Sequence, residues 1–237
     1  MRFPDPLIRG TLIKRYKRFL ADVELSDSTA VTAHCPNPGA MLGLDAPGSE
    51  VWLSPARNPA RKLRYTFELI RVGGGLVGIN TGHPNALVAE AVAEGRIAEL
   101  TGYDTIRREV KYGKNSRIDL LLEGPGRPTC YVEVKNVHLK RDSAPAGGLA
   151  EFPDSVTARG LKHLAELSDM VAAGHRAVMA YVVQREDCGS FALAGDIDPA
   201  YAAGFRAARE AGVEAVCYSC KLSVESIELS WPLPIEA

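Results

Sequence analysis

Residues 116–136 read "SRIDLLLEGPGRPTCYVEVKN" and place three charged residues inside two apolar segments. Asp119 lies at the head of the first apolar run, and Glu133 and Lys135 interrupt the second. Burying a charged side chain is costly unless the charge is paired or binds a metal. The segment 124–129 between the two runs is rich in Gly and Pro, which is typical of a turn. We therefore expect two neighbouring strands whose charged side chains meet at one site.

The alternation of side chains along a strand gives these charges a common direction. Glu133 and Lys135 point to one face of the second strand, and we assign the opposite face, with Val132 and Val134, to the core. Pairing of the two strands across the turn brings Asp119 beside Glu133. Two carboxylates that converge in this way repel each other unless a divalent cation lies between them. The stretch therefore predicts a metal site.

The same groups are suited to phosphodiester hydrolysis. Mg²⁺ prefers oxygen ligands and retains several water molecules, so Asp119, Glu133 and the carbonyl of Val134 could hold Mg²⁺ or Mn²⁺ with positions left for a phosphate. Lys135 could then orient the attacking water or stabilise charge on the scissile phosphate. An Asp followed, after thirteen residues, by Glu-x-Lys resembles the PD-(D/E)xK signature of restriction-endonuclease-like nucleases.

The segments around this stretch predict a mixed α/β domain over residues 81–237. Apolar residues at helical spacing alternate with strand-like runs in the order α, β, β, β, α, β, α, β. The acidic pair falls on the second and third elements of the β run, which is its place in PD-(D/E)xK nucleases. The predicted ranges are 85–100, 105–113, 116–124, 129–139, 157–174, 176–186, 199–212 and 213–223.

Residues 1–80 have a different spacing of apolar runs and turn residues. Short apolar runs divided by turn residues, such as "GSEVWLSPA" and "RKLRYTFELIRVGGGLVGINTG", predict a small all-β unit of the barrel type. This part has 11 Lys and Arg against 7 Asp and Glu, whereas residues 81–237 have 17 against 22. We therefore expect two domains, 1–80 and 81–237, of opposite net charge.

The segment "KRYKRF" (residues 14–19) combines four cations with two aromatic rings. Cations attract a phosphate backbone and aromatic faces stack on bases, so the segment predicts a nucleic-acid surface. The alternative is a solvated edge strand that its cations protect from pairing with other chains. The four cations are Lys14, Arg15, Lys17 and Arg18.

Composition narrows the class of protein further. The 237 residues, 46% of them hydrophobic, can build a substantial core. The sequence has no run of about 18 apolar residues that would span a membrane, and its N-terminus lacks the apolar block of a signal peptide. Its five cysteines are odd in number and irregularly spaced, which is typical of a reducing compartment. We expect a cytoplasmic protein without membrane contact.

Longer motifs resemble one family in particular. The segments "HCPNPGAM", "INTGHPNALVAEA", "SRIDLLLE", "CYVEVKNVHL" and "FPDSVTARGLKHLAEL" follow one another through most of the chain. Together they resemble the sugar fermentation stimulation protein A family of bacteria and archaea. The resemblance implies an N-terminal OB-like β-barrel, a C-terminal PD-(D/E)xK nuclease-like domain, DNA binding and a role in regulating genes of sugar (maltose) metabolism. It also implies that Asp119, Glu133 and Lys135 occupy the metal and catalytic positions.

Two functions stay open on this basis. The first is a deoxyribonuclease that depends on Mg²⁺ or Mn²⁺. The second is a non-catalytic regulator that retains the nuclease fold only to bind DNA. A pure binder has no physical need for two converging carboxylates, which repel DNA phosphates when no metal is bound. The intact triad therefore favours the nuclease.

The helix predicted after the third strand offers candidate phosphate contacts. Four of its polar residues fall at i, i+3, i+4 and i+7, so they share one face of the helix. That face could contact DNA next to the metal, or it could be an ordinary solvated face. The four residues are Arg159, Lys162, His163 and Glu166.

Two further groups of residues are candidates for metal binding or DNA contact, and solvent exposure is the alternative for each. An extra metal ligand could come from the first helix, through Glu90, Glu94 or Glu99, although surface exposure explains each of them equally simply. His138 and Lys140 continue the face of Glu133 beyond the strand. They could contact DNA or face solvent.

Overall fold

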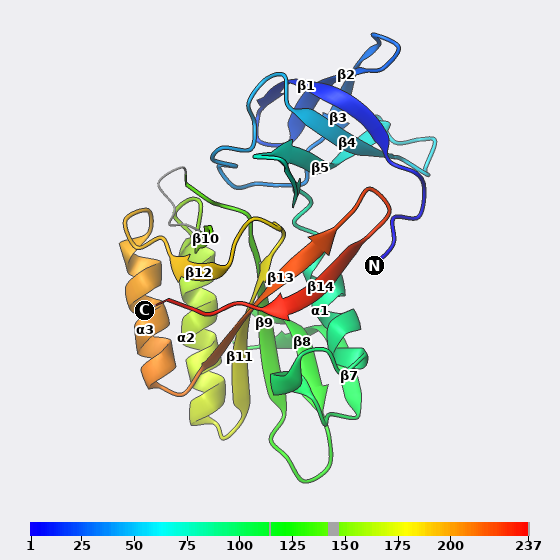
Figure 1. The fold of residues 1–237 in the computed structure, drawn as a ribbon. Coiled ribbons are helices and arrows are strands. Elements are labelled where there is room, and N and C mark those ends of the chain that lie inside the picture. The colour runs from blue at the N-terminus through cyan, green and yellow to red at the C-terminus, as the bar shows by residue number, and fades with distance from the viewer. Residues whose placement is uncertain (114, 142–146, 237) are drawn as a thin grey trace.

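The chain folds into a small β-barrel that lies against a larger mixed α/β domain (Figure 1). A computed structural model describes residues 1–113, 115–141 and 147–236. The expected succession of an all-β unit and a mixed α/β domain is confirmed. None of the described helices is long and apolar enough to cross a membrane.

The barrel is built from antiparallel strands and closed by one parallel pairing. Its five strands are β1 (Ile8–Tyr16), β2 (Leu20–Leu25), β3 (Ala30–His34), β4 (Glu50–Pro55) and β5 (Tyr65–Val72), and β6 (Gly75–Gly78) extends the sheet beside β5. They follow the order β3-β2-β1-β4-β5-β6, and β3 also pairs with β5, which closes the barrel. Alternating apolar side chains such as Leu12, Val23 and Phe67 fill the interior. Gly10 lets β1 and β2 approach closely, because a Cβ there would lie 2.5 Å from the Val23 side chain.

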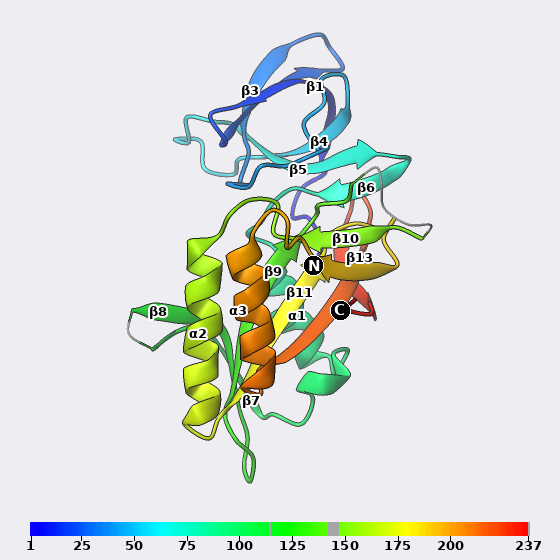
Figure 2. The same cartoon turned by 90° about the vertical axis from the view of Figure 1, so that its left-hand side faces the viewer.

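The second domain is a six-stranded mixed sheet with helices on both faces. Its elements are α1 (Pro84–Ala93), the 3₁₀ helix η1 (Ala98–Leu100), β7 (Thr105–Tyr112), β8 (Ser116–Glu123), β9 (Cys130–Val137), β10 (Leu149–Phe152), α2 (Ala158–Ala172), β11 (Arg176–Val183), β12 (Ser190–Leu193), α3 (Pro199–Glu210), β13 (Glu214–Leu222) and β14 (Ile227–Pro232). The sheet order is β14-β13-β11-β9-β8-β7, with β9, β11 and β13 parallel. Figure 2 shows α2 and α3 side by side on one face, while α1 contacts the other.

Each face of this sheet has its own apolar layer. Val132 and Val134 belong to the layer on the α1 side, which confirms the predicted core face of β9. The layer beneath α2 and α3 includes Leu164 and Tyr181. Strand β11 is buried along nearly its whole length because helices cover both faces, as its continuous apolar sequence predicts.

Some element boundaries differ from the prediction. The helix predicted over 85–100 ends at Ala93, because Gly95 adopts a left-handed conformation with φ of +70°. Asn85 does not cap this helix, since Pro84 already lies within its first turn. The short strands β10 and β12 and the edge strand β14 were absent from the predicted order. Four-residue strands carry too little periodicity to be recognised in sequence.

A polar junction joins the barrel to the second domain. Asp154, which precedes α2, accepts a hydrogen bond from the Met41 amide at 2.9 Å and contacts His138 Nε2 at 3.2 Å. Gln184, after β11, donates to Asn136 Oδ1 at 2.6 Å, and its carbonyl accepts a bond from β6. Asn136 and His138 lie at the end of β9. Strand β9, which carries Glu133, is therefore linked to the barrel through Asp154 and Gln184.

Candidate functional site

The acidic pair lies where strands β8 and β9 separate. Their ladder ends at the pair Leu120–Val132, so the register places Asp119 opposite Glu133. The backbone amide of Val134 then donates to Asp119 Oδ2 at 2.7 Å. A side-chain carboxylate thus replaces the next carbonyl of the ladder, and the predicted convergence of Asp119 and Glu133 is present in the structure.

Asp119 is held from both sides by polar groups. Asn85, at the start of α1, donates to Asp119 Oδ1 at 2.7 Å. Strand β7 departs from regular strand geometry beside it at Glu109, which has a φ of +54°, while the β7–β8 register stays unshifted and places Glu109 opposite Asp119. Burial and the charge of Glu133 raise the pKa of Asp119 to about 6, although the bonds from Val134 and Asn85 oppose this rise. A cation between the two carboxylates would favour their charged forms.

Glu133 is buried, and its two oxygens differ. Oε1 accepts a hydrogen bond from Lys135 Nζ at 2.7 Å and contacts His163 Nδ1. Oε2 is buried and has no hydrogen-bond partner in the described part of the chain. Burial alone would raise the pKa of Glu133, but the bond to His163 and the charge of Lys135 lower it below its usual value. Glu133 is therefore a charged group with one oxygen left to bind a ligand.

The donor set fits a hard divalent cation. Glu133 Oε2 is the orphaned buried oxygen, Asp119 supplies a second carboxylate, and carboxylate and carbonyl oxygens are the ligands that Mg²⁺ and Mn²⁺ accept. Across the described ranges, no three His, Cys, Asp or Glu side chains converge as a ready metal cluster. A cation here would therefore depend on two carboxylates, a main-chain oxygen such as that of Val134, and water.

Helix α2 presents two kinds of side chain to this site. Its predicted polar face is not uniformly solvated, because His163 and Glu166 are buried whereas Arg159 and Lys162 are exposed. His163 lies between Glu133 and Arg159, whose Nε is 3.4 Å from His163 Nε2. Both carboxylate oxygens of Glu166 are buried without a hydrogen-bond partner among the described residues, and Lys162 Nζ is 3.6 Å away.

The glutamates predicted as extra ligands are occupied elsewhere. Glu90 binds the N-terminal amine at 2.8 Å, Glu94 pairs with Arg96, and Glu99 accepts a hydrogen bond from Tyr218. Helix α1 contributes Asn85 to the acidic pair instead of a glutamate. Asn85 lies at the start of the helix within the motif "INTGHPNALVAEA", and that motif is the sequence signal that could have pointed to it.

The four basic residues of the barrel occupy different environments. Strand β1 pairs with β2 as far as Tyr16 but with β4 only over Ile8–Thr11, so at Lys14 and Arg15 it has a partner strand on one side only, as the alternative of an edge strand expects. Lys17 and Arg18 form the exposed turn between β1 and β2, and Lys14 lies 3.6 Å from Asp22. Arg15 is half-buried and fixes the segment after β3, so we assign it a structural role. Its guanidinium donates to the carbonyls of Arg18, Asn37, Gly39 and Ala40.

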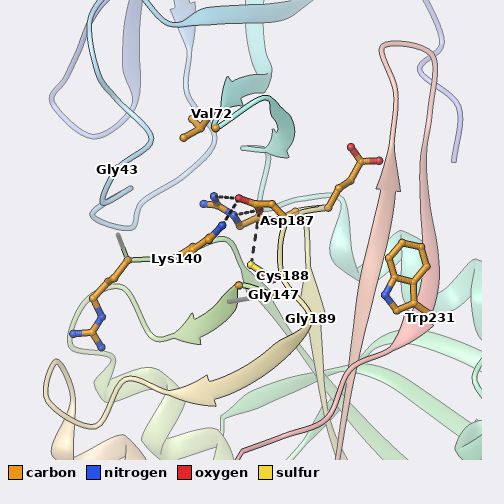
Figure 3. Close-up of a pocket in the computed structure, with 13 residues that line it drawn as sticks. Gly43, Val72, Lys140, Gly147, Asp187, Cys188, Gly189 and Trp231 are labelled. Carbon is orange, nitrogen blue, oxygen red and sulfur yellow. Dashed lines mark hydrogen bonds and ion pairs between the residues drawn. The ribbon is translucent and has the colours of Figure 1, made fainter. Parts of the chain in front are cut away.

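A cavity of about 670 Å³ lies between the barrel and the second domain, and no residue of the acidic pair lines it (Figure 3). Lys140 and Arg185 converge there on Asp187, at 2.9 and 2.8 Å. Trp231 lies across the cavity from this cluster. Lys140 is therefore paired, and His138 is buried at the domain junction, so neither is a solvated extension of the Glu133 face.

Fold and site together define a class of protein, an OB barrel followed by a restriction-endonuclease-like domain with a PD-(D/E)xK arrangement. Residues 13–79 match the model described as "SfsA N-terminal OB domain", and residues 82–226 match "Sugar fermentation stimulation protein RE domain". The chain therefore belongs to the sugar fermentation stimulation protein family.

Relatives match this chain over its full length. Sugar fermentation stimulation protein homologs from Paramagnetospirillum magneticum and Rhodospirillum centenum are each 64% identical to it, and the matches cover 100% of this chain and 98% and 100% of theirs. The structure of Pyrococcus furiosus SfsA in complex with Ca²⁺ is similar with a TM-score of 0.88 at 26% identity, covering 100% of this chain and 98% of the other.

Proposed function

We propose that this protein is a DNA-binding nuclease that hydrolyses phosphodiester bonds with Mg²⁺ or Mn²⁺. The observation that carries the proposal is the convergence of Asp119 and Glu133, with the buried Oε2 of Glu133 unpartnered and Lys135 alongside. The related protein from Pyrococcus furiosus was captured with Ca²⁺, a divalent ion of the same oxygen-binding kind. That relationship supports a cation at the corresponding acidic pair here.

Each residue of the site has a role in this proposal. Asp119, Glu133 and the Val134 carbonyl hold the cation, which polarises the scissile phosphate and activates water when bound. Lys135 places a positive charge beside Glu133, where it can orient the attacking water and stabilise charge that develops on the phosphate. His163 fixes Oε1 of Glu133 and so directs Oε2 toward the cation. We therefore propose His163 as a positioning residue rather than a DNA contact.

The DNA backbone would be held by cations of both domains. Lys14, Lys17 and Arg18 lie on or beside the turn between β1 and β2, and Arg159 and Lys162 are exposed on α2 next to the acidic pair. Lys162 Nζ reaches Ser116 Oγ at 3.1 Å, so it lies over the start of β8. These positions support phosphate contacts on either side of the cleavage site.

The second candidate is a DNA-binding regulator of sugar (maltose) metabolism genes that does not cut DNA. One observation favours it, because Lys135 is already paired with Glu133 and is only 14% exposed. One observation opposes it. The burial of Asp119 beside Glu133 destabilises the folded protein when both carboxylates are ionised, and the two charges repel DNA phosphates. DNA binding alone does not explain why the chain carries this pair.

Purified protein incubated with DNA and Mg²⁺ or Mn²⁺ separates the two functions. The nuclease should cleave single-stranded, double-stranded or branched DNA only with the metal, and Asp119→Ala and Lys135→Ala should each abolish cleavage. Glu123→Gln, a change on the same strand as Asp119 at a side chain that is 41% exposed, serves as the matched control and should cleave normally. Failure of the unmodified protein to cut any of these substrates while still binding them would refute the nuclease.

A further inference from the structure

The excess positive charge of the barrel gathers on two of its loops. Three carboxylates of the barrel pair with other cations, since Asp5 binds Arg57, Asp22 lies beside Lys14, and Glu50 binds cations of β1 and β5. In the described part of the chain, no ion pair includes the exposed cations of the β1–β2 turn or the last three of the β4–β5 loop. These cations are Lys17, Arg18, Arg61, Lys62 and Arg64.

The two loops meet over the end of strand β3. Leu20, directly after the β1–β2 turn, pairs with His34. Arg61, from the β4–β5 loop, lies 3.2 Å from His34 Nδ1 and donates to Thr66 Oγ1 at 3.1 Å. Burial and the charge of Arg61 lower the pKa of His34, so His34 is neutral at pH 7 and adds no charge to this surface. The cations of both loops therefore belong to one surface.

An exposed aromatic ring lies within this surface. Phe19, in the β1–β2 turn, is 48% exposed, and its carbonyl accepts a hydrogen bond from the amide of Cys35, directly after His34. Exposure of this apolar ring to water is unfavourable, so a ligand that covers the ring gains free energy from its burial. Phosphate-binding cations around an exposed ring form the combination that single-stranded nucleic acids require, because their bases are available to stack.

We propose that the turn of residues 17–19 and residues 61–64 of the β4–β5 loop form one binding face for single-stranded DNA. This inference rests on the proposed nucleic-acid function and names its substrate class. A duplex could use the cations but not Phe19, since its bases are stacked inside. An unpaired strand uses both, so the face prefers single strands over a duplex of equal length.

A series of side-chain contacts connects this face to the acidic pair. Arg15 ties the turn to the segment that ends at Met41, and the Met41 amide binds Asp154. Asp154 lies just before α2, which carries His163 to Glu133. A strand that leaves the barrel face along these contacts approaches the site proposed for cleavage.

Equilibrium binding in EDTA tests this inference without cleavage. The full chain is titrated into a fluorescein-labelled 12-mer of thymidine, with a 12-base-pair duplex as competitor, at several salt concentrations. Lys62→Ala combined with Arg64→Ala removes two phosphate contacts, which should reduce the salt slope by about 1.4, at about 0.7 per contact for single strands. Phe19→Ala should weaken binding about fivefold or more at every salt concentration with the slope unchanged.

Arg57→Ala is the matched control, because it removes a cation of the same loop that Asp5 already neutralises. It should bind the 12-mer within twofold of the unmodified protein. Equal affinity for duplex and single strand, or an unaltered salt slope in the double variant, overturns the inference. Because metal is absent, single-strand binding by a protein that never cuts DNA would uphold this face while refuting the nuclease.

Discussion

Replacing Asp119 by asparagine should stabilise the metal-free protein at alkaline pH. Val134 and Asn85 each donate to one oxygen of Asp119. An asparagine can keep the bond from Val134, and its amide can donate to Asn85 once the Asn85 side chain flips. The substitution therefore preserves the shape and most hydrogen bonds of the site while removing a buried charge that faces Glu133.

The size of the effect follows from the pKa of Asp119. Its value is raised from 3.8 to about 6, chiefly by burial and then by Glu133. A carboxyl with a raised pKa binds a proton more tightly in the folded state, so its contribution favours folding in acid and is lost as the pH rises through 6. A shift of about two units corresponds to about 3 kcal/mol at pH 8, and to roughly 6–12 °C in melting temperature for a chain of this size. At pH 4 the difference should nearly vanish.

Urea unfolding of both proteins at pH 4, 6 and 8 in EDTA measures this difference. Glu123→Gln on the same strand removes a carboxylate whose side chain is 41% exposed, and it should show no such pH dependence. Added Mg²⁺ at 100 times its dissociation constant should stabilise the unmodified protein by about 2.7 kcal/mol and leave Asp119→Asn unchanged. If Asp119→Asn were no more stable at pH 8, or equally stabilised by Mg²⁺, the reasoning about this carboxylate would be refuted.

Three other changes test how the site and its supports are held. His163→Ala removes the contact that fixes Glu133, so Mn²⁺ affinity measured by calorimetry should fall about 10–100-fold, and an unchanged affinity would contradict the positioning role. Arg15→Ala should lower the free energy of unfolding in urea by about 2–3 kcal/mol, because charged hydrogen bonds to four carbonyls are lost, and a change below 0.5 kcal/mol would make its role minor. Asp198→Ala should lower it by about 1–3 kcal/mol in thermal unfolding, since Asp198 caps α3 and also accepts the Thr157 amide; a neutral result would contradict this double role.

The acidic pair could be predicted from sequence because strand geometry is strict. The two-residue period of β9 determines the faces of Glu133 and Val134, and a short turn restricts where β8 can pair. The two-domain order followed from a change near residue 80, where short apolar runs divided by turn residues give way to long segments of helical periodicity that alternate with strands. These inferences use local patterns, which the sequence displays directly.

The surroundings of the pair depend on contacts that no local pattern encodes. Burial of His163 against Glu133 requires the position of α2 on the sheet, and a helix face with Arg159 and Lys162 resembles a solvated one in sequence. The engagement of Arg15 by loop carbonyls likewise requires the path of the chain after β3. Asn85 reaches Asp119 only because α1 starts beside the split between β8 and β9.

Strand β9 also has a mechanical consequence. It carries Glu133 near its middle, while His138, five residues later, contacts Asp154 at the barrel junction. At about 3.3 Å per residue, the two positions are joined by roughly 16 Å of extended chain, which resists stretching because neighbouring strands hold it along its length. Strand β9 is thus a rigid connection between the barrel and Glu133. A displacement of the barrel by a long bound substrate would be transmitted to the Glu133 carboxylate, because no hinge lies between them.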